Sequence, residues 1–170
     1  LQLIDFDRVE QSNLASQGYL EDDLGLEKAR ATATLCSRIN SHMEVHVCPK
    51  RFRRRMEIGN TVFCCVDSIQ VRQLIWAAVG DVVLFYCDGR MSAEVLRILT
   101  ACDSDSRYHY PKTLFAAEQA YTGACTAKTT IYCANIAAGL MVAQFTRFLR
   151  GLPVDADLQC NLLSSELSVT

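Results

Sequence analysis

The chain alternates short apolar runs with longer amphipathic stretches. Continuous apolar runs are typical of buried parallel strands, whereas alternating polar and apolar residues are typical of strands with one exposed face. On these criteria the predicted strands are residues 1–5, 44–48, 61–66, 82–87, 94–100 and 158–169. Apolar residues that recur at helical spacing predict helices at residues 24–40, 68–79 and 131–150.

The last predicted helix carries the longest apolar stripe. We interpret this stripe, like Trp76, as packing in the core or at a dimer interface and not as a cofactor contact. The stripe consists of Ile131, Ala134, Ala138, Val142, Phe145 and Leu149.

Polar segments separate these elements. Residues 7–23 are predicted as a loop with a short helical turn, and residues 102–124 as a long surface loop. Ser68 is a predicted N-cap of the helix that follows it. Asp88-Gly89 is above all a turn signal, which we favour over a place for Arg90 in a substrate cleft.

The order of elements predicts an α/β fold, with a Rossmann-like, mainly parallel sheet and an antiparallel extension. We expect one domain over residues 1–170, with a nucleotide-binding part at 1–100, a mobile loop at 101–128, and a late helix and closing strand at 129–170. Ligands of such sheets bind beyond the C-terminal strand ends. Asp5 and Asp67 are predicted to lie at that edge.

Charge and hydropathy exclude some functions. The net charge of -2 and a pI of about 5.9 give no general attraction to nucleic acid or to a membrane surface. The basic run at residues 50–55 could bind nucleic acid, but we favour a solvated loop or a dock for an acidic partner. Residues 129–146 lack charge, yet Asn135 and Gln144 interrupt them, so a buried helix is expected in place of a membrane span.

The nine cysteines do not form a metal-binding pattern. They lack the C-x-x-C spacing of structural zinc sites, so no zinc is predicted, and we interpret them as reduced thiols of a cytoplasmic protein. His42, His46 and His109 are dispersed along the chain. Structural or surface roles are expected for all of them.

Residues 5–17 read DFDRVEQSNLASQ and are followed by DDLGLEKA at residues 22–29. This segment resembles the signature of the ThiF/MoeB/ubiquitin-activating family, D-x-D-x-V-x-x-S-N-L-x-R-Q followed by D-x-G-x-x-K-A. Residues 65–68 with Arg72, and the helix end at residues 148–151, resemble later family elements. The resemblance covers almost the whole chain and is sharpest in the first thirty residues.

The resemblance implies an adenylyltransferase, a nucleotidyltransferase that uses ATP and Mg²⁺ to activate the C-terminal carboxylate of a ubiquitin-like or sulfur-carrier protein, usually as a homodimer. Asp5 would hold the ribose hydroxyls, and Asn13 and Lys28 would contact the phosphates. Asp7 and Gln17 belong to the same nucleotide-binding motif. Asp67 would sit by the magnesium and the attacking carboxylate. We expect the side chains of Asp5, Asn13, Lys28 and Asp67 to converge on one pocket. Such a reaction brings two anions together, so cations and amide donors must offset the repulsion.

Cys125-Thr126 resembles the Cys-Thr pair that carries the transfer cysteine of eukaryotic relatives. A thiol at a helix N-terminus gains thiolate character, to which Lys128 could add. A thioester or persulfide relay would use this thiol. The alternative is that Cys125 is a small packing residue, like most of the other cysteines.

The sequence departs from the family pattern in places. Ser16 stands where the family has Arg, and the spacing to Lys28 is one residue short. The glycine-rich turn expected before Leu1 is absent, so we interpret the chain as an N-terminally truncated member without its first strand and phosphate loop, and expect this fragment to bind ATP weakly and be inactive. The alternatives are a degenerate, non-catalytic scaffold that binds a partner protein, and a generic dinucleotide enzyme.

Overall fold

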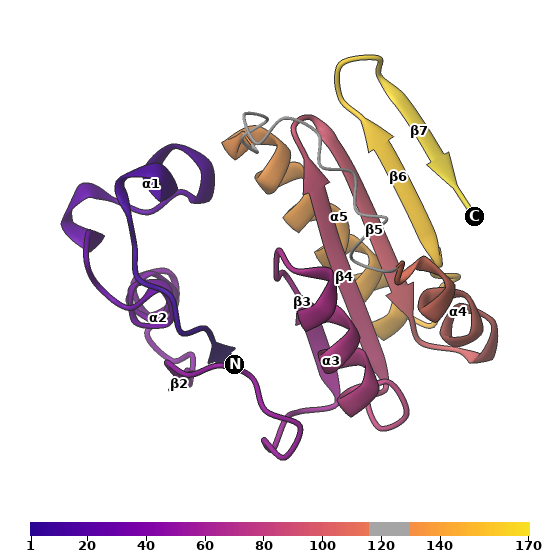
Figure 1. The fold of residues 1–170 in the computed structure, drawn as a ribbon, viewed down its shortest axis with the longest axis horizontal. Helices are drawn as coiled ribbons and strands as arrows, with labels where there is room; N and C mark the ends of the chain where they lie inside the picture. Colours follow the sequence, from indigo (N-terminus) through magenta and orange to yellow (C-terminus); the bar gives the residue numbers. More distant parts are fainter. Residues whose placement is uncertain (116–129) are drawn as a thin grey trace. The chain divides into compact units, whose positions relative to one another are not determined.

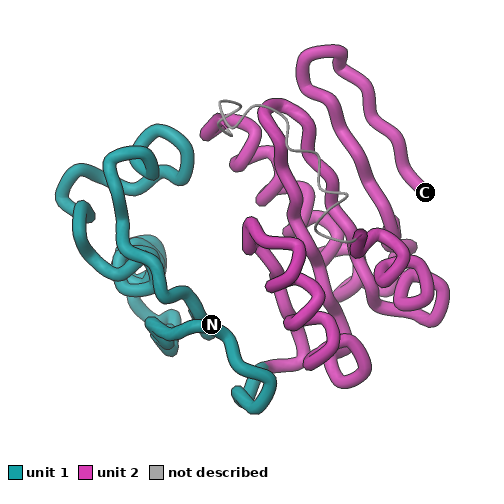
Figure 2. Tube along the Cα trace, in the orientation of Figure 1, with its two compact units in different colours: residues 1–58 teal, residues 59–170 magenta. Residues whose placement is uncertain are grey.

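The structure is a computed structural model that describes residues 1–115 and 130–170. The described residues form two compact units, Leu1–Ile58 and Gly59–Thr170 (Figure 2). Each unit has strands and helices of its own (Figure 1).

A parallel pair of strands anchors the unit Leu1–Ile58. In this pair β1 (Gln2–Ile4) lies beside β2 (His46–Cys48), with Ile4 opposite Cys48. Parallel neighbours need a long crossover, which here contains α1 (Gln11–Gln17), the 3-10 helix η1 (Glu21–Asp23) and α2 (Lys28–Ile39). The segment predicted as a loop with one helical turn therefore holds both α1 and η1.

The helix α2 begins four residues later than predicted. The residues before it are held in an extended pairing, in which Val9 N donates to Leu26 O at 2.9 Å and Gly25 N to Val9 O at 2.9 Å. Gly25 adopts a left-handed conformation with φ 80°, which a residue without a Cβ adopts readily. This local pairing competes with the helical pattern and delays the helix to Lys28.

The unit Gly59–Thr170 is built on one sheet of order β3-β4-β5-β6-β7. The strands β3 (Thr61–Cys64) and β4 (Phe85–Ser92) are parallel and joined by α3 (Ile69–Val79). Antiparallel pairing adds β5 (Val95–Ala101), β6 (Asp157–Asn161) and β7 (Glu166–Val169). The predicted α/β fold, with parallel strands and an antiparallel extension, is confirmed.

The prediction of a turn at Asp88-Gly89 was wrong. Both residues lie inside β4 with Arg90, and the β4–β5 turn lies at Ala93, where φ is 51°. The glycine leaves room for the Met141 side chain, because a Cβ at Gly89 would lie 2.6 Å from Met141 Sδ. Glycine inside a strand often marks such a close approach.

Two other segments also differ from their predictions. Residues 158–169 form a hairpin of β6 and β7 in place of one strand, with Ser165 at φ 56° in the turn. The predicted loop after residue 101 begins with α4 (Ser104–His109) and the 3-10 helix η2 (Tyr110–Thr113). Residues 116–129, which carry Cys125 and Lys128, lie outside the described residues.

The last helix, α5 (Ile131–Leu149), packs on one face of the sheet against Phe85, Cys87 and Ile98. The helix was predicted correctly, and of the predicted apolar stripe Phe145 packs against the core. The buried residues of α5 are Cys133, Ala137, Met141 and Gln144.

Gln144 lies on the buried face of α5 although its side chain is polar. This amide is 2% exposed because its Nε2 donates to Asp155 Oδ2 at 2.9 Å and its Oε1 accepts from Asp155 N at 3.1 Å. A buried polar group with its hydrogen bonds satisfied is stable in a core, but an apolar pattern does not reveal it. Val142, assigned to a stripe in the core or at a dimer interface, is 56% exposed and does not belong to the core of this chain.

Aromatic residues pack on the opposite face of the sheet. Trp76 of α3 lies against Tyr86 and Tyr110, with ring centroids 5.0 and 4.5 Å apart, as expected of a core residue. The Tyr86 and Tyr110 hydroxyls are 3.1 Å apart. Among the described residues every cysteine is a free thiol, and no helix there has the length and apolarity needed to cross a membrane.

Candidate functional site

One candidate site is a cluster at the C-terminal end of β1. Asp5 follows β1 directly, and its backbone N donates to Cys48 O of β2 at 3.3 Å. Its Oδ1 accepts from Asp7 N at 2.8 Å. The strand pairing therefore places Asp5, and the turn at Asp5 places Asp7.

Lys28 joins this cluster from the start of α2. Its Nζ lies 3.6 Å from Asp7 Oδ2, and its side chain is 12% exposed against 50% for Asp7. The backbone N of Lys28 also donates to Asp7 O at 2.9 Å. Asp7 thus contacts both Asp5 and Lys28, and a nucleotide-binding role for these residues stays a prediction.

The donors and acceptors of this cluster fit a nucleotide. Asp5 has a second carboxylate oxygen beside the one that holds Asp7 N, and a carboxylate can accept hydrogen bonds from ribose hydroxyls. Lys28 supplies an ammonium group that can donate to phosphate oxygens. The arrangement can therefore hold a diol with one group and an anion with another.

Asn13 and Gln17 belong to α1. The Oδ1 of Asn13 accepts from Glu10 N at 2.9 Å, which caps the first turn of the helix. Gln17 is exposed at the last position of α1, which ends at Gly18 with φ 73°. Contacts of these two residues with a nucleotide stay predictions.

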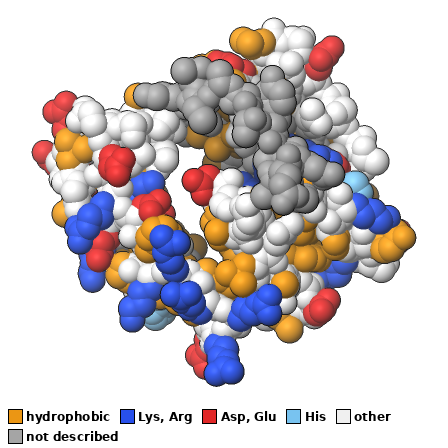
Figure 3. Space-filling model, viewed as in Figure 1, with side chains coloured by type: hydrophobic (Ala, Val, Ile, Leu, Met, Phe, Trp, Pro, Cys, Tyr) orange, Lys and Arg blue, Asp and Glu red, His pale blue; other side chains and the backbone are white. Residues whose placement is uncertain are grey.

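The basic run begins at the same strand edge. Lys50 N donates to Cys48 O at 2.8 Å, the carbonyl that also accepts from Asp5 N. The guanidinium of Arg51 lies 4.0 Å from the centroid of the Phe6 ring. Lys and Arg side chains gather on the visible face of the unit Leu1–Ile58 (Figure 3). Nucleic acid and an acidic protein both remain candidate partners of these side chains.

A separate candidate site in the unit Gly59–Thr170 is the segment between β3 and α3. It carries Asp67, whose side chain is exposed, and Ser68, whose Oγ accepts from Val71 N at 3.4 Å as the predicted N-cap. Among the described residues, no hydrogen bond or ion pair engages the Asp67 carboxylate. An exposed carboxylate at the end of a parallel strand suits a hard cation such as Mg²⁺.

A buried charge network lies next to this segment, and the sequence did not predict it. Asp88 is fully buried and forms ion pairs with Arg72 and, at 2.8 Å, with Arg90. Tyr110 Oη donates to Asp88 Oδ2 at 2.9 Å, and Arg90 Nη1 donates to Thr113 O at 2.8 Å. Removing one partner of such a pair leaves a buried charge, at a cost of about 3–5 kcal/mol.

The signal for this network was present in the sequence. Asp88 follows a long apolar run, and Arg90 lies two residues further on, on the same face of a strand. A charge within a buried strand requires a partner. The Asp-Gly pair instead suggested a turn.

A buried thiol near this network is held in the neutral form. Cys87 is fully buried, and burial raises the pKa of its thiol to about 12. The pKa of Tyr110 is raised for the same reason. These groups are poor nucleophiles at neutral pH, while the predicted role of Cys125 stays a prediction.

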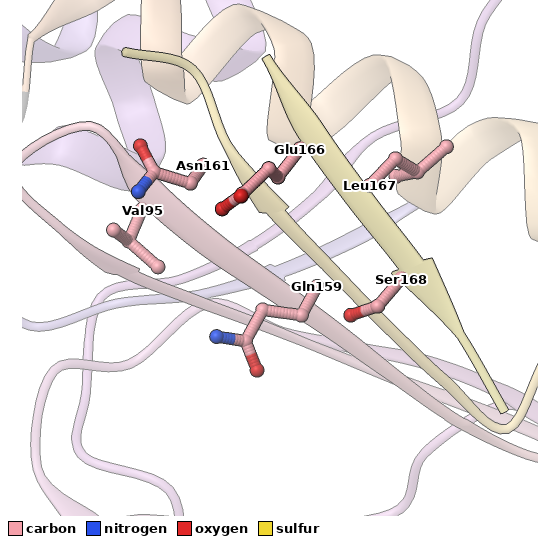
Figure 4. A pocket seen from close by; sticks show the side chains of 6 residues that line it. All are labelled: Val95, Gln159, Asn161, Glu166, Leu167 and Ser168. Atoms are coloured by element: carbon pink, nitrogen blue, oxygen red, sulfur yellow. The ribbon is translucent and has the colours of Figure 1, made fainter. Parts of the chain in front are cut away.

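Other surfaces of the described residues offer fewer groups that could bind a ligand or take part in a reaction. A shallow groove on the antiparallel extension is lined from β6 and β7 by Gln159, Asn161 and Glu166, and by Val95 beside them (Figure 4). It lies at the opposite edge of the sheet from β3. Within residues 1–115 and 130–170 there is no group of three His, Cys, Asp or Glu side chains that could hold a metal ion.

The predicted site residues are divided between the two units. Asp5, Asp7 and Lys28 meet within Leu1–Ile58, whereas Asp67 belongs to Gly59–Thr170. That all of them surround one pocket stays a prediction.

The fold resembles those of solved structures. PaaA matches with a TM-score of 0.76 at 14% identity, over 99% of this chain and 55% of PaaA. MccB of E. coli matches with a TM-score of 0.74 at 15% identity, over 99% of this chain and 54% of MccB. MccB with AMPCPP and MccA matches with a TM-score of 0.77 at 14% identity, over 99% and 55%.

At these identities the likeness shows the fold alone, and the chain spans about half the length of these structures. A comparison with curated protein sequences gave no match. The model of the ThiF family, in contrast, matches residues 1–167. Because this match covers almost all of the 170 residues, the chain belongs to the ThiF family.

Proposed function

We propose that the protein is an adenylyltransferase that uses ATP to activate the C-terminal carboxylate of a peptide or small protein. The observation that carries the proposal is the cluster of Asp5, Asp7 and Lys28 at the C-terminal end of β1. Its acceptors and its cation match the ribose and phosphates of a nucleotide. Membership of the ThiF family supports the same activity.

Each of these residues would have a role that follows from the chemistry of its side chain. Asp5 would accept hydrogen bonds from the ribose hydroxyls, and Lys28 would donate to the phosphates and offset their charge as the acceptor carboxylate approaches. Asp67 would hold Mg²⁺ together with the phosphates, since this ion is usually bound by one or two carboxylates and substrate oxygens. Mg²⁺ would supply further stabilisation of charge at the reacting phosphate.

We infer that the acceptor is a ubiquitin-like or sulfur-carrier protein, with a peptide as the other possibility. MccB, which shares the fold, has been crystallised with ATP and with the peptide MccA. We also propose a homodimer, to which the exposed apolar residues of α5, such as Ile136 at 40% and Val142 at 56%, would contribute.

The test is ATP–pyrophosphate exchange by the full-length protein, with candidate carrier proteins and peptides as acceptors. Exchange that depends on the acceptor C-terminus is expected. Asp67→Asn should lower the exchange rate at least about 100-fold, the loss typical of one charged group at a reacting centre. Because Asp67 is exposed, the melting temperature should stay unchanged.

Asp81→Asn is the matched control, because Asp81 is an exposed acid beyond the other end of α3. Its exchange rate should equal that of the unmodified protein. Equal rates for both variants would remove Asp67 from the reaction.

A non-catalytic scaffold is the second candidate, and Ser16 favours it. Ser16 is uncharged, and its Oγ donates to Ser12 O at 2.9 Å within α1. The cation that the family has at this position is therefore missing. A scaffold would bind a partner protein and give no exchange with any acceptor.

A further inference from the structure

One buried guanidinium contacts the segment that carries Asp67. Arg72 lies in the first turns of α3 and is 5% exposed. Its Nη1 pairs with Asp88, and its Nη2 donates to Val66 O and, at 3.2 Å, to Gly89 O. Val66 immediately precedes Asp67, so Arg72 joins the interior of the sheet to the backbone beside that carboxylate.

The segment needs such a contact, because it lies between regular elements. β3 ends at Cys64 and α3 begins at Ile69, so the backbone from 65 to 68 belongs to neither. The N-cap of Ser68 fixes the end of the segment at the helix. Arg72 supplies the corresponding bond at Val66.

Asp88 is itself held from the far side. Arg90 Nε donates to its Oδ2 at 2.8 Å, and Tyr110 Oη donates to the same oxygen at 2.9 Å. Its Oδ1 faces Arg72. A carboxylate fixed in this way determines where the guanidinium lies, and the planar fork of Arg then determines the direction of its other donors.

From this geometry we propose that Arg72, oriented by Asp88, is a positioning residue that fixes Val66 and so the carboxylate of Asp67. The proposal rests on the proposed function, in which Asp67 binds Mg²⁺ with the nucleotide. Arg72 acts through Asp67 and does not itself contact ATP or the acceptor.

The first test measures the segment without any ligand. Arg72→Lys keeps the charge but lacks the guanidinium fork, so it should speed hydrogen exchange at the amides of residues 65–68 about tenfold or more. Arg97→Lys is the matched control. It weakens a different Arg–Asp pair of the sheet, between Arg97 and Asp157, which does not bond to residues 65–68, and exchange at residues 65–68 should stay unchanged.

The second test measures ATP affinity of the full-length protein by calorimetry, with Mg²⁺ and with EDTA. The unmodified protein should bind ATP more tightly with Mg²⁺. Arg72→Lys should lose most of this gain while keeping its affinity in EDTA within about twofold, and Asp67→Asn should lose the same part. The double variant should lose no more than either single variant, which is the pattern of residues that act as one unit.

A role in stability alone predicts other results. It would lower the melting temperature of Arg72→Lys and Arg97→Lys, but it would leave both the Mg²⁺ gain and the exchange at 65–68 as they are in the unmodified protein. That outcome overturns the proposal, as do additive losses in the double variant. If the unmodified protein binds no ATP, the proposed function fails, and the exchange result alone decides whether Arg72 fixes the segment.

Discussion

At the scale of single residues, Lys28 is the strongest link between motif and geometry. Its ammonium group lies in a largely buried position beside Asp7, where it can donate to a phosphate. Lys28→Met should therefore weaken ATP binding by about 10–100-fold, since a hydrogen bond to a charged group contributes about 1.5–3 kcal/mol. Calorimetry on the full-length protein measures this change.

The same helix offers the control for this change. Arg30 lies two residues further along α2, is 65% exposed and pairs with Glu27. Such surface pairs contribute little, so Arg30→Met should keep the ATP affinity within about twofold. Equal losses in the two variants would indicate a general effect of charge, and no loss in Lys28→Met would remove Lys28 from the nucleotide site.

Residue patterns could predict part of the candidate site. Asp5, Asp7 and Lys28 stand at fixed spacings within a local segment, and the structure brings them together. The pair of Arg72 and Asp88 joins α3 to β4, and no periodicity in the sequence reports a contact between separate elements. Such pairs become visible only when the strand order is known.

At the scale of elements, α4 depends on its N-cap. Asp103 Oδ1 accepts from Ser106 N at 2.9 Å, and Ser106 Oγ accepts from Asp103 N at 3.1 Å. The hydrogen bonds that the Asp103 carboxylate accepts from Ser106 N and, at 2.8 Å, from Ser106 Oγ lower the pKa of Asp103. Asp103→Ala should lower the free energy of unfolding by about 1 kcal/mol, the usual cost of a lost cap, as measured by urea unfolding.

Asp105→Ala is the control for the cap, because Asp105 is an exposed acid in the same first turn. Its substitution should cost only a few tenths of a kcal/mol, the size of an interaction with the helix dipole. A cost as large as that of Asp103→Ala would mean that the charge of the turn matters and the cap does not.

The capped helix shows why some elements escaped prediction. The long helix α5 and the cap at Ser68 follow from apolar spacing and a good capping residue, and both were predicted. α4 has only six residues, SDSRYH, without an apolar stripe. Its stability comes from Asp103 and from bonds of Arg107 to carbonyls such as Val83 O, at 2.6 Å, which a sequence pattern cannot show.

At the scale of the whole molecule, alternating strands and helices sufficed to predict an α/β class. The pairing of strands was less accessible. The hairpin of β6 and β7 was taken for one strand, because its turn, Leu162 to Ser165, begins with apolar residues. The sequence did hold a turn signal at Asn161, whose Oδ1 accepts from Leu163 N at 3.1 Å, but the apolar neighbours Cys160 and Leu162 masked it.

The stability of the molecule depends on pH through a carboxylate that joins several elements. Asp157 of β6 accepts from Arg97 Nε at 2.8 Å and lies 2.9 Å from His109 Nε2, so one carboxylate links β5, β6 and α4. Burial raises the pKa of Asp157, but the hydrogen bonds and charges of Arg97 and His109 outweigh burial and leave it below its ordinary value. The folded state therefore releases this proton more readily than the unfolded chain.

This depressed pKa fixes the sign of the effect. The stability that Asp157 contributes is fully present above its unfolded pKa of about 3.9 and is lost as the pH falls through the lower, folded value. At pH 7, Asp157→Asn should lower the free energy of unfolding by about 1 kcal/mol, at the low end for a charged hydrogen bond because Arg97 is partly exposed to solvent. Urea unfolding from pH 7 to pH 3 should show the two proteins converging only below about pH 4. Asp81→Asn is the control, and because its position is exposed its stability should follow that of the unmodified protein throughout. If Asp157→Asn instead differs from the unmodified protein by a constant amount down to pH 3, packing and not the charge of Asp157 holds β6 to its neighbours.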